Sequence, residues 1–323
     1  MLFITNRFPT QSIRTRAGRK FTFDLSDNAP SNSLFYCETG VDGDHTEITS
    51  KGLLRRIRES DYKQVLLLIH GFNTLPDDAL KGAAELQELC DKAKKNEVLV
   101  LPLIWPCDDD RGVVKDYWDD QKSADLSGFS FARALSKFLE WRNSEENEPD
   151  VAPCLMRINI LAHSMGNRVL RQTLIAWNKY DLATGVPLLF RNTFMVAADV
   201  VNETLHTNEP GALISHASRN VVVYYASDDL ALRASKAANL KNKVASRRLG
   251  HTGPESIKKT PRNVYQVDCD NVNTQYDHPV GHNYFRYGED DGKPGLVFEH
   301  IFRCIDKGRV FPDDQEKRSH VLD

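Results

Sequence analysis

The sequence lacks any apolar run long enough to cross a membrane. A spanning helix needs about 20 predominantly apolar residues, and the apolar runs here, such as QVLLLI at 64–69, are far shorter. The first residues, MLFITNRFP, also contain too short an apolar run for a secretory signal peptide. We therefore expect no membrane span and a cytoplasmic protein.

The sequence also has no excess of basic over acidic residues. The chain has 42 Lys and Arg against 45 Asp and Glu, which gives a formal net charge of −3. Nucleic-acid-binding domains usually carry a basic surface, so the charge gives no reason to expect nucleic acid as a partner. Hydrophobic residues make up 41% of the chain and charged residues 27%, a balance typical of a globular protein with a buried core.

Cysteine pairs at regular spacing are absent too. The six cysteines are scattered, without a C-x-x-C pair: Cys37, Cys90, Cys107, Cys154, Cys269 and Cys304. This pattern favours free thiols in a reducing compartment over disulfides or a zinc site.

Short apolar runs alternate with amphipathic stretches along most of the chain. The runs predict strands at 64–70, 97–105, 155–163, 191–199, 220–227 and, as the last strand, 263–268. The amphipathic stretches predict helices at 76–95, roughly 115–142, 165–179 and 230–243. Strands that alternate with helices indicate an α/β fold, with a mostly parallel central sheet and helices on both faces.

The stretch INILAHSMGNRVL at 158–170 places Ser164 between a predicted strand and a predicted helix. The residues two before and two after it, Ala162 and Gly166, are small. This matches the nucleophile elbow G-x-S-x-G, with alanine in place of the first glycine. A serine that only caps the helix is the alternative, but a cap would not need small residues on both sides. We therefore predict that Ser164 is a nucleophile.

A nucleophilic serine needs hydrogen-bond donors for the oxyanion that forms when it attacks a carbonyl. The backbone amide of Met165, the residue after the serine, is the first candidate. The second normally comes from the loop after an earlier strand, which IHGFN supplies, and we predict the amide of Phe72. His70 or Asn73 would fix this loop by side-chain hydrogen bonds. An ordinary strand-ending turn is the alternative interpretation of His70 and Gly71.

The triad acid should follow the serine along the chain. YYASDDLAL offers Asp228 and Asp229 just after the strand at 220–227, and Asp229 is favoured because it lies nearer the helix start. Asp199, at the end of MVAAD, is the runner-up. Each of these carboxylates could instead cap a helix.

The histidine base should come after the acid. Four histidines follow the last predicted strand: His278, His282, His300 and His320. DHPVGHNYF comes soon after that strand, so His282 is the predicted base and His278 the second choice. No metal site is predicted in this segment, because Pro279 and Gly281 break the helix that an H-x-x-x-H pair would need.

The motifs IHGFN, LIWP, LAHSMGNRVL, YYASDDLAL and GHNYF occur in this order, and with them the chain resembles the α/β-hydrolase superfamily. More narrowly, it resembles the bacterial branch known as domain of unknown function 900. In that branch a Trp-Pro pair ends the fourth strand, as Trp105 and Pro106 do here, and a tyrosine such as Tyr117 follows. The resemblance covers roughly residues 60–305, and LFITNR is similar to the opening strand of that branch.

This resemblance implies an α/β-hydrolase fold with Ser164 as nucleophile, His282 as base and Asp229 as acid. The implied chemistry is acyl transfer through an acyl-enzyme, with no cofactor. It implies no substrate, because that branch has none assigned.

We predict a serine esterase that acts on a small-molecule acyl ester. Nothing resembles a large helical lid, which favours soluble or short-chain esters over triglycerides. An amidase, thioesterase or acyltransferase with the same triad is an alternative, and so is an inactive binding protein on a hydrolase fold. The sequence does not determine the oligomeric state.

The chain contains no internal repeat, low-complexity linker or Gly/Ser hinge, so we predict a single domain over residues 1–323. Residues 1–60 should form edge strands, from LFITNR and SLFYCETG, and connecting loops. Residues 61–305 should form the catalytic core, and residues 306–323 a C-terminal tail.

Overall fold

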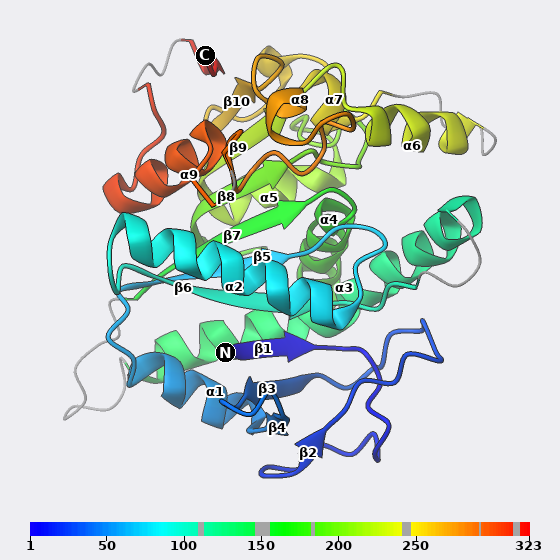
Figure 1. The fold of residues 1–323 in the computed structure, drawn as a ribbon, viewed down its shortest axis with the longest axis vertical. Coiled ribbons are helices and arrows are strands. Elements are labelled where there is room, and N and C mark those ends of the chain that lie inside the picture. The colour runs from blue at the N-terminus through cyan, green and yellow to red at the C-terminus, as the bar shows by residue number, and fades with distance from the viewer. Residues whose placement is uncertain (109–112, 146–155, 182–184, 241–246, 291, 313–316) are drawn as a thin grey trace. The chain divides into compact units, whose positions relative to one another are not determined.

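The structure is a computed structural model that describes residues 1–108, 113–145, 156–181, 185–240, 247–290, 292–312 and 317–323 (Figure 1). The chain divides into two compact units. The first consists of Met1–Ile158 and Gln172–Val186, and the second of Asn159–Arg171 and Pro187–Asp323. The single domain stays a prediction.

The strands of the first unit form a mixed sheet in the order β5-β6-β1-β3-β4-β2. Their bounds are β1 (Leu2–Thr5), β2 (Lys20–Phe21), β3 (Phe35–Thr39), β4 (His45–Glu47), β5 (Gln64–Ile69) and β6 (Val98–Ile104). The pairs β5–β6 and β6–β1 are parallel, and the pairs from β1 to β2 are antiparallel. Every residue of β5 is buried, which explains its continuous apolar sequence.

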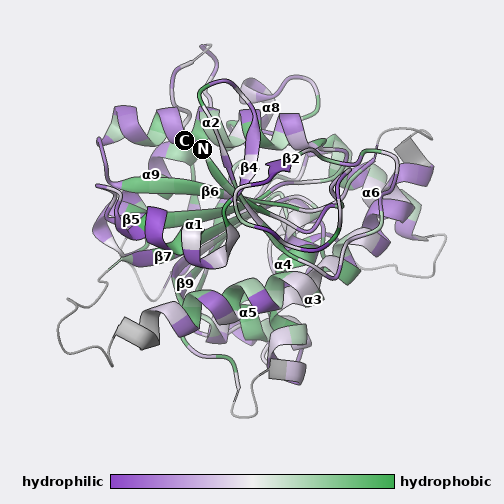
Figure 2. Cartoon of the chain, turned by 90° about the horizontal axis from the view of Figure 1, so that it is seen from below, coloured by the Kyte–Doolittle hydropathy of each residue, from purple (hydrophilic) through white to green (hydrophobic). Residues whose placement is uncertain are grey.

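The described part of the first unit contains three complete helices and one helical turn, and two of the helices contact strands of this sheet. These elements are α1 (Thr49–Arg58), α2 (Pro76–Ala93), α3 (Val113–Glu145) and a π-helical turn, η1 (Trp177–Asp181). Pro76 stands in the first turn of α2 with Asp77 and Asp78, where a fixed φ and negative charges favour a helix start. Helix α2 contacts β6 and helix α1 contacts β3. Figure 2 shows β6 in the green of apolar residues, while α2 carries both green and purple residues.

The strands of the second unit follow the order β11-β10-β9-β8-β7. They are β7 (Arg157–His163), β8 (Phe190–Val196), β9 (Ser218–Tyr225), β10 (Val264–Asp268) and β11 (Ser319–Val321). The pairs β8–β9, β9–β10 and β10–β11 are parallel. Their carboxyl ends therefore meet at one edge of the sheet, the edge where ligands bind in open α/β sheets.

The helices of the second unit are short, apart from three. They are α4 (Gly166–Ala176), α5 (Leu213–His216), α6 (Leu230–Leu240), α7 (Leu249–Thr252), α8 (Asn273–Tyr276) and α9 (Leu296–Lys307), with 3₁₀ turns η2 (Pro210–Ala212) and η3 (Ile257–Lys259). The residues of α4 from Gln172 onward belong to the first unit. Helices α5 and α7 contact β9, and α9 contacts β8. Helix α9 ends at Gly308, whose φ of 67° is a left-handed conformation that glycine adopts easily.

The predicted α/β architecture is confirmed, but the chain ends differ from prediction. The segment LFITNR does not form an edge strand, because β1 lies between β6 and β3. The predicted loop between LFITNR and SLFYCETG contains β2, and helix α1 also falls within the first 60 residues. The strand at 263–268 is not the last one, because β11 in the predicted tail pairs with β10. Strands of two or three residues such as β2 and β11 leave too little alternation for a pattern to show.

Among the described cysteines, five are free and buried: Cys37, Cys90, Cys107, Cys269 and Cys304. This agrees with the predicted free thiols; Cys154 lies outside the described residues. In the same part of the chain, none of the helices combines the length and the apolar character needed to cross a membrane.

Gly250, at the start of α7, packs directly against main chain. A Cβ there would lie 2.1 Å from the amide nitrogen of Ala198 and 2.2 Å from the carbonyl carbon of Ala197. We expect Gly250→Ala to lower the free energy of unfolding by about 1–3 kcal/mol, because the main chain would have to shift. Chemical denaturation measures this. Gly288→Ala is the control, since its Cβ would meet nothing closer than 3.5 Å; equal losses in both variants would contradict the prediction.

Candidate active site

Ser164 lies in a tight turn between the end of β7 and the start of α4. Its φ is 52°, a left-handed conformation that costs a non-glycine residue about 1–2 kcal/mol. The turn is held from both sides, because the amide of Ser164 donates to the carbonyl of Val196 over 3.0 Å and the amide of Asp199 donates to the carbonyl of Ser164 over 3.1 Å. This geometry matches the strained strand-to-helix turn described for nucleophile elbows, and the role of Ser164 as nucleophile stays a prediction.

Asn167, which was not among the predicted site residues, closes the same turn. Its fully buried side-chain amide donates to the carbonyl of Ala162 over 2.8 Å and to that of Ser164 over 3.1 Å. A buried Asn amide in the first turn of a helix is available for such bonds. The signal in the sequence was an asparagine directly after the small residue of the elbow.

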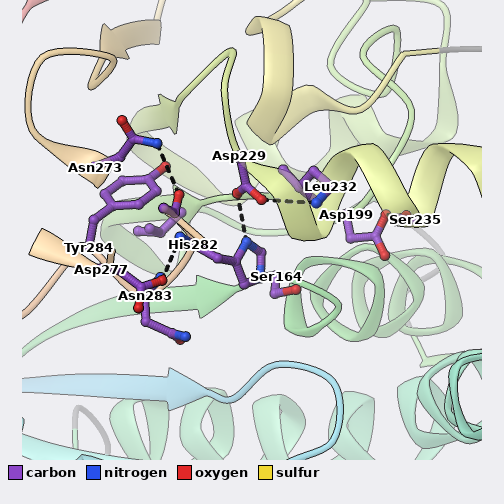
Figure 3. Close-up of polar contacts among 12 residues, drawn as sticks. Ser164, Asp199, Asp229, Leu232, Ser235, Asn273, Asp277, His282, Asn283 and Tyr284 are labelled. Atoms are coloured by element: carbon purple, nitrogen blue, oxygen red, sulfur yellow. Dashed lines mark hydrogen bonds and ion pairs between the residues drawn. The ribbon is translucent and has the colours of Figure 1, made fainter. Parts of the chain in front are cut away.

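The predicted acid and base are in direct contact. His282 Nδ1 lies 2.6 Å from Asp229 Oδ2, and the other carboxylate oxygen, Oδ1, accepts the amide of Leu232 over 2.9 Å. Asp229 immediately precedes α6, so the second bond is a helix N-cap. The two interpretations of Asp229, triad acid and helix cap, are therefore compatible. Figure 3 shows Ser164 drawn beside the His282 ring, with dashed lines from Asp229 to His282 and Leu232.

Burial and charge act in opposite directions on His282. Burial lowers the pKa of the imidazole, but the hydrogen bond to Asp229 and its negative charge, with smaller contributions from Asp199 and Asp277, raise the pKa above the ordinary value of 6.5. Asp229 itself is fully buried. A buried carboxylate on Nδ1 fixes the ring orientation and leaves Nε2 as the nitrogen that can take a proton.

The carboxylates of the two other candidate acids, Asp199 and Asp228, bond to residues other than His282. Asp199 Oδ1 lies 3.2 Å from Nε of buried Arg248 and accepts the hydroxyl of Ser235 over 2.5 Å. Asp228 Oδ1 accepts the side-chain amide of Asn273 over 2.5 Å. Neither interaction involves His282.

His278, the second candidate base, is exposed in the loop before His282. Of the two histidines in this loop, only His282 is hydrogen-bonded to a carboxylate of the described residues. In this same part of the chain, no hydrogen bond joins Ser164 Oγ to His282; such bonds are often long before substrate binds.

The predicted oxyanion donors belong to different units. Met165 follows Ser164 and is fully buried at the beginning of α4. Phe72 lies in the loop after β5, where its ring packs edge-on against Tyr117 at a centroid distance of 5.6 Å. Asn73, the next residue, has a φ of 53°. The role of Phe72 as a donor stays a prediction.

His70 fixes the start of the Phe72 loop, as the sequence suggested. Its Nε2 accepts the amide of Trp105 over 3.1 Å, so the proton lies on Nδ1, which donates to the carbonyl of Gly71 over 2.9 Å. The rings of His70 and Trp105 stack at 5.2 Å, and Trp105 Nε1 donates to the carbonyl of His70. Burial lowers the pKa of His70 to about 4, so the ring is neutral at pH 7.

Asp120 in α3, which no sequence motif indicated, holds the other end of this loop. This fully buried carboxylate accepts the amide of Asn73 over 3.2 Å, the amide of Asp108 over 3.1 Å and the side chain of Asn28 over 2.8 Å. Burial raises its pKa to about 6, although these donors act in the opposite direction. The DYWDDQ sequence contains several acids, and nothing in it singled out this one.

The cysteines offer no competing nucleophile among the described residues. Burial raises the pKa of Cys90 and of Cys304 to about 12, and it raises the pKa values of Cys37, Cys107 and Cys269 as well. A thiol of high pKa is not a reactive thiolate at neutral pH. Within this same part of the chain, no group of three or more His, Cys, Asp or Glu is arranged to hold a metal ion.

A parallel sheet, a serine elbow after a buried strand and a carboxylate–histidine pair at the carboxyl ends of later strands are features of the α/β-hydrolase class. Residues 46–289 match the family described as alpha/beta hydrolase of unknown function (DUF900), and the chain belongs to this family. The predicted family and fold are confirmed, and the family makes the chain a hydrolase of some kind. Comparisons with curated proteins and with solved structures returned no match.

The backbone strain at Ser164 can be measured without any substrate. Ser164→Gly and Ser164→Ala both remove the hydroxyl, but only glycine adopts a φ of 52° without steric cost. We therefore expect the glycine variant to have the higher free energy of unfolding, by about 1 kcal/mol. Denaturant titration of both variants measures this. An alanine variant as stable as the glycine variant would show that the turn is not strained in solution.

Proposed function

We propose that this protein is a serine hydrolase that cleaves carboxylic esters with Ser164, His282 and Asp229 as its triad. The observation that supports this most strongly is the 2.6 Å contact between His282 and the buried carboxylate of Asp229. The strained turn at Ser164 supports the proposal independently. A carboxylate orients the histidine, which can then activate a nearby hydroxyl.

The proposed reaction has two halves. Ser164 Oγ attacks the acyl carbon of the ester while His282 Nε2 takes the hydroxyl proton, and Asp229 stabilises the imidazolium that results. The tetrahedral oxyanion accepts hydrogen bonds from the backbone amides of Met165 and Phe72, and each bond stabilises the transition state by about 3 kcal/mol. Collapse of this intermediate expels the alcohol, which receives the proton from His282. In the second half, His282 takes a proton from a water molecule as the water attacks the acyl carbon of the acyl-enzyme. Collapse of this second intermediate releases the carboxylic acid, and Ser164 Oγ receives the proton from His282.

The proposal includes a small-molecule substrate, no nucleic acid and no cofactor. The formal net charge of −3 supports the exclusion of nucleic acid. A cytoplasmic location is also part of the proposal, and the free state of the five described cysteines supports a reducing compartment.

Labelling with a fluorophosphonate probe tests the nucleophile directly. We expect the wild-type protein to be labelled, and both Ser164→Ala and His282→Ala to lose labelling, because the probe reacts only with an activated serine. His278→Ala is the matched control and should be labelled like the wild type, since His278 is exposed in the same loop.

A folded wild-type protein that stays unlabelled would overturn the proposed function and favour a binding protein on a hydrolase fold. If the wild-type protein is labelled, a fresh sample that has not been treated with the probe can be assayed with matched p-nitrophenyl esters, thioesters and anilides of increasing chain length. Faster hydrolysis of a thioester or an anilide than of the matched ester would replace the esterase proposal with one of the alternatives that share the triad.

The pH dependence of ester hydrolysis tests the role of Asp229. His282 must be neutral to act as a base, so kcat/KM should fall as the pH drops below its raised pKa, above 6.5. Asp229→Asn removes the negative charge that raises this pKa. We expect the midpoint to move to lower pH and kcat/KM to fall by about 10³–10⁴-fold.

Asp228→Asn is the control, because Asp228 contacts Asn273 instead of the histidine. Its pH midpoint should match that of the wild type. A midpoint that stays the same in Asp229→Asn, or moves only in Asp228→Asn, would contradict the assignment of the acid.

A further inference from the structure

His163, the residue directly before Ser164, is bonded to the residue that carries the proposed base. Its Nε2 lies 3.1 Å from the main-chain carbonyl oxygen of His282. A carbonyl only accepts hydrogen bonds, so the His163 proton must lie on Nε2. His163 is buried, and its ring contacts two other rings, with centroid distances of 4.9 Å to His282 and 5.1 Å to Phe285.

The amide side of His282 is held by a second side chain. Asp277 Oδ2 accepts the amides of His282 and Asn283, each over 2.7 Å. Asp277 is the residue that ends α8, and Figure 3 shows it beside His282 and Asn283. The peptide group before the His282 Cα is therefore bonded to Asp277, and the peptide group after it is bonded to Asp277 through the Asn283 amide and to His163 through the His282 carbonyl.

The loop between Asp277 and His282 has further anchors. The carbonyl of Val280 accepts the amide of Leu230, the residue after Asp229, over 3.0 Å. Gly281 has a φ of 68° and its carbonyl accepts the side-chain amide of Asn273 over 3.1 Å. These bonds tie the loop to the acid side of the site, whereas the His163 bond ties it to the nucleophile side.

We propose that His163 and Asp277 are positioning residues that fix the main chain of His282, and that His163 sets the separation between the base and Ser164. This inference rests on the proposed function, because it names the residues that hold the base of the proposed triad in position. His163 is suited to this role by covalent connection: it is the last residue of β7, and Ser164 is the next residue. The hydrogen bond from His163 to the His282 carbonyl therefore fixes the position of the base relative to the nucleophile, and no loop lies between His163 and Ser164.

The physical basis is the sensitivity of proton transfer to geometry. Nδ1 of His282 is fixed by Asp229, but that bond alone lets the ring pivot about the carboxylate. Bonds at the amide and at the carbonyl remove this freedom and hold Nε2 in one place. A displacement of about 1 Å can reduce catalysis by roughly 10²-fold, so the loss of these bonds should reduce turnover without removing any group that reacts.

His163→Met and His163→Gln form the matched pair that tests this. The two side chains have similar size and shape, but only glutamine has an N–H that can donate to the His282 carbonyl. We expect the rate constant for fluorophosphonate labelling and the kcat of ester hydrolysis to fall roughly 10–100-fold in His163→Met, with KM nearly unchanged. His163→Gln should retain both within about threefold. Thermal unfolding of each variant confirms that the protein is folded.

A double-mutant cycle distinguishes positioning from a general structural role. In the His282→Ala background, His163→Met should cause no further loss of residual ester hydrolysis, because the group that it positions is gone. A further loss there would overturn the proposal. Equal activity of the Met and Gln variants would also overturn it, whether both are reduced or both resemble the wild type.

If His163→Met fails to fold, Asp277→Ala and Asp277→Asn test the bonds to the amides of His282 and Asn283. Asparagine keeps one oxygen that can accept an amide, whereas alanine has none. We expect the alanine variant to lose at least tenfold in labelling rate and the asparagine variant to retain most of it. Equal rates would overturn the proposal. The absence of labelling in the folded wild-type protein would instead overturn the proposed function, so the two failures are distinguishable.

Discussion

The left-handed backbone of Ser164 is the constraint on which the rest of the candidate site depends. A residue with φ near 52° is unfavourable unless its surroundings hold it. The end of β8 and the main chain that follows it provide this support, through the carbonyl of Val196 and the amide of Asp199. The side chain of Asn167 donates to the carbonyl of Ser164 and closes the turn. The strained position of the serine is therefore a property of the packed sheet, although the turn itself is local.

Asp229 links the stability of a helix to the orientation of the histidine. One carboxylate oxygen caps α6 through Leu232, and the other contacts His282. A fully buried carboxylate is costly unless hydrogen bonds satisfy it, and here both oxygens have partners. The fold thus keeps a charge in place beside the imidazole. Burial alone would lower the histidine pKa, but the hydrogen bond to Asp229 and the charges of Asp229, Asp199 and Asp277 together raise it.

Local patterns predicted the strands and helices that surround the site, because each is long enough to carry a signal. The continuous apolar run of β5 and the Pro76 start of α2 are examples. The sequence patterns did not predict very short strands, or pairings that depend on residues far away in the chain. The two-residue β2 has too few residues to alternate, and the position of β1 between β6 and β3 depends on strands that come later in the chain.

The sequence by itself determined the family and predicted the tight turn at Ser164, because small residues around a serine and a buried run before it are local features. Only the tertiary structure decided which of Asp199, Asp228 and Asp229 contacts His282, since the two bonded residues are 53 positions apart. It also brought His163 and Asp277 to opposite sides of the same residue. Such contacts depend on how loops pack at the ends of parallel strands, which no short pattern encodes.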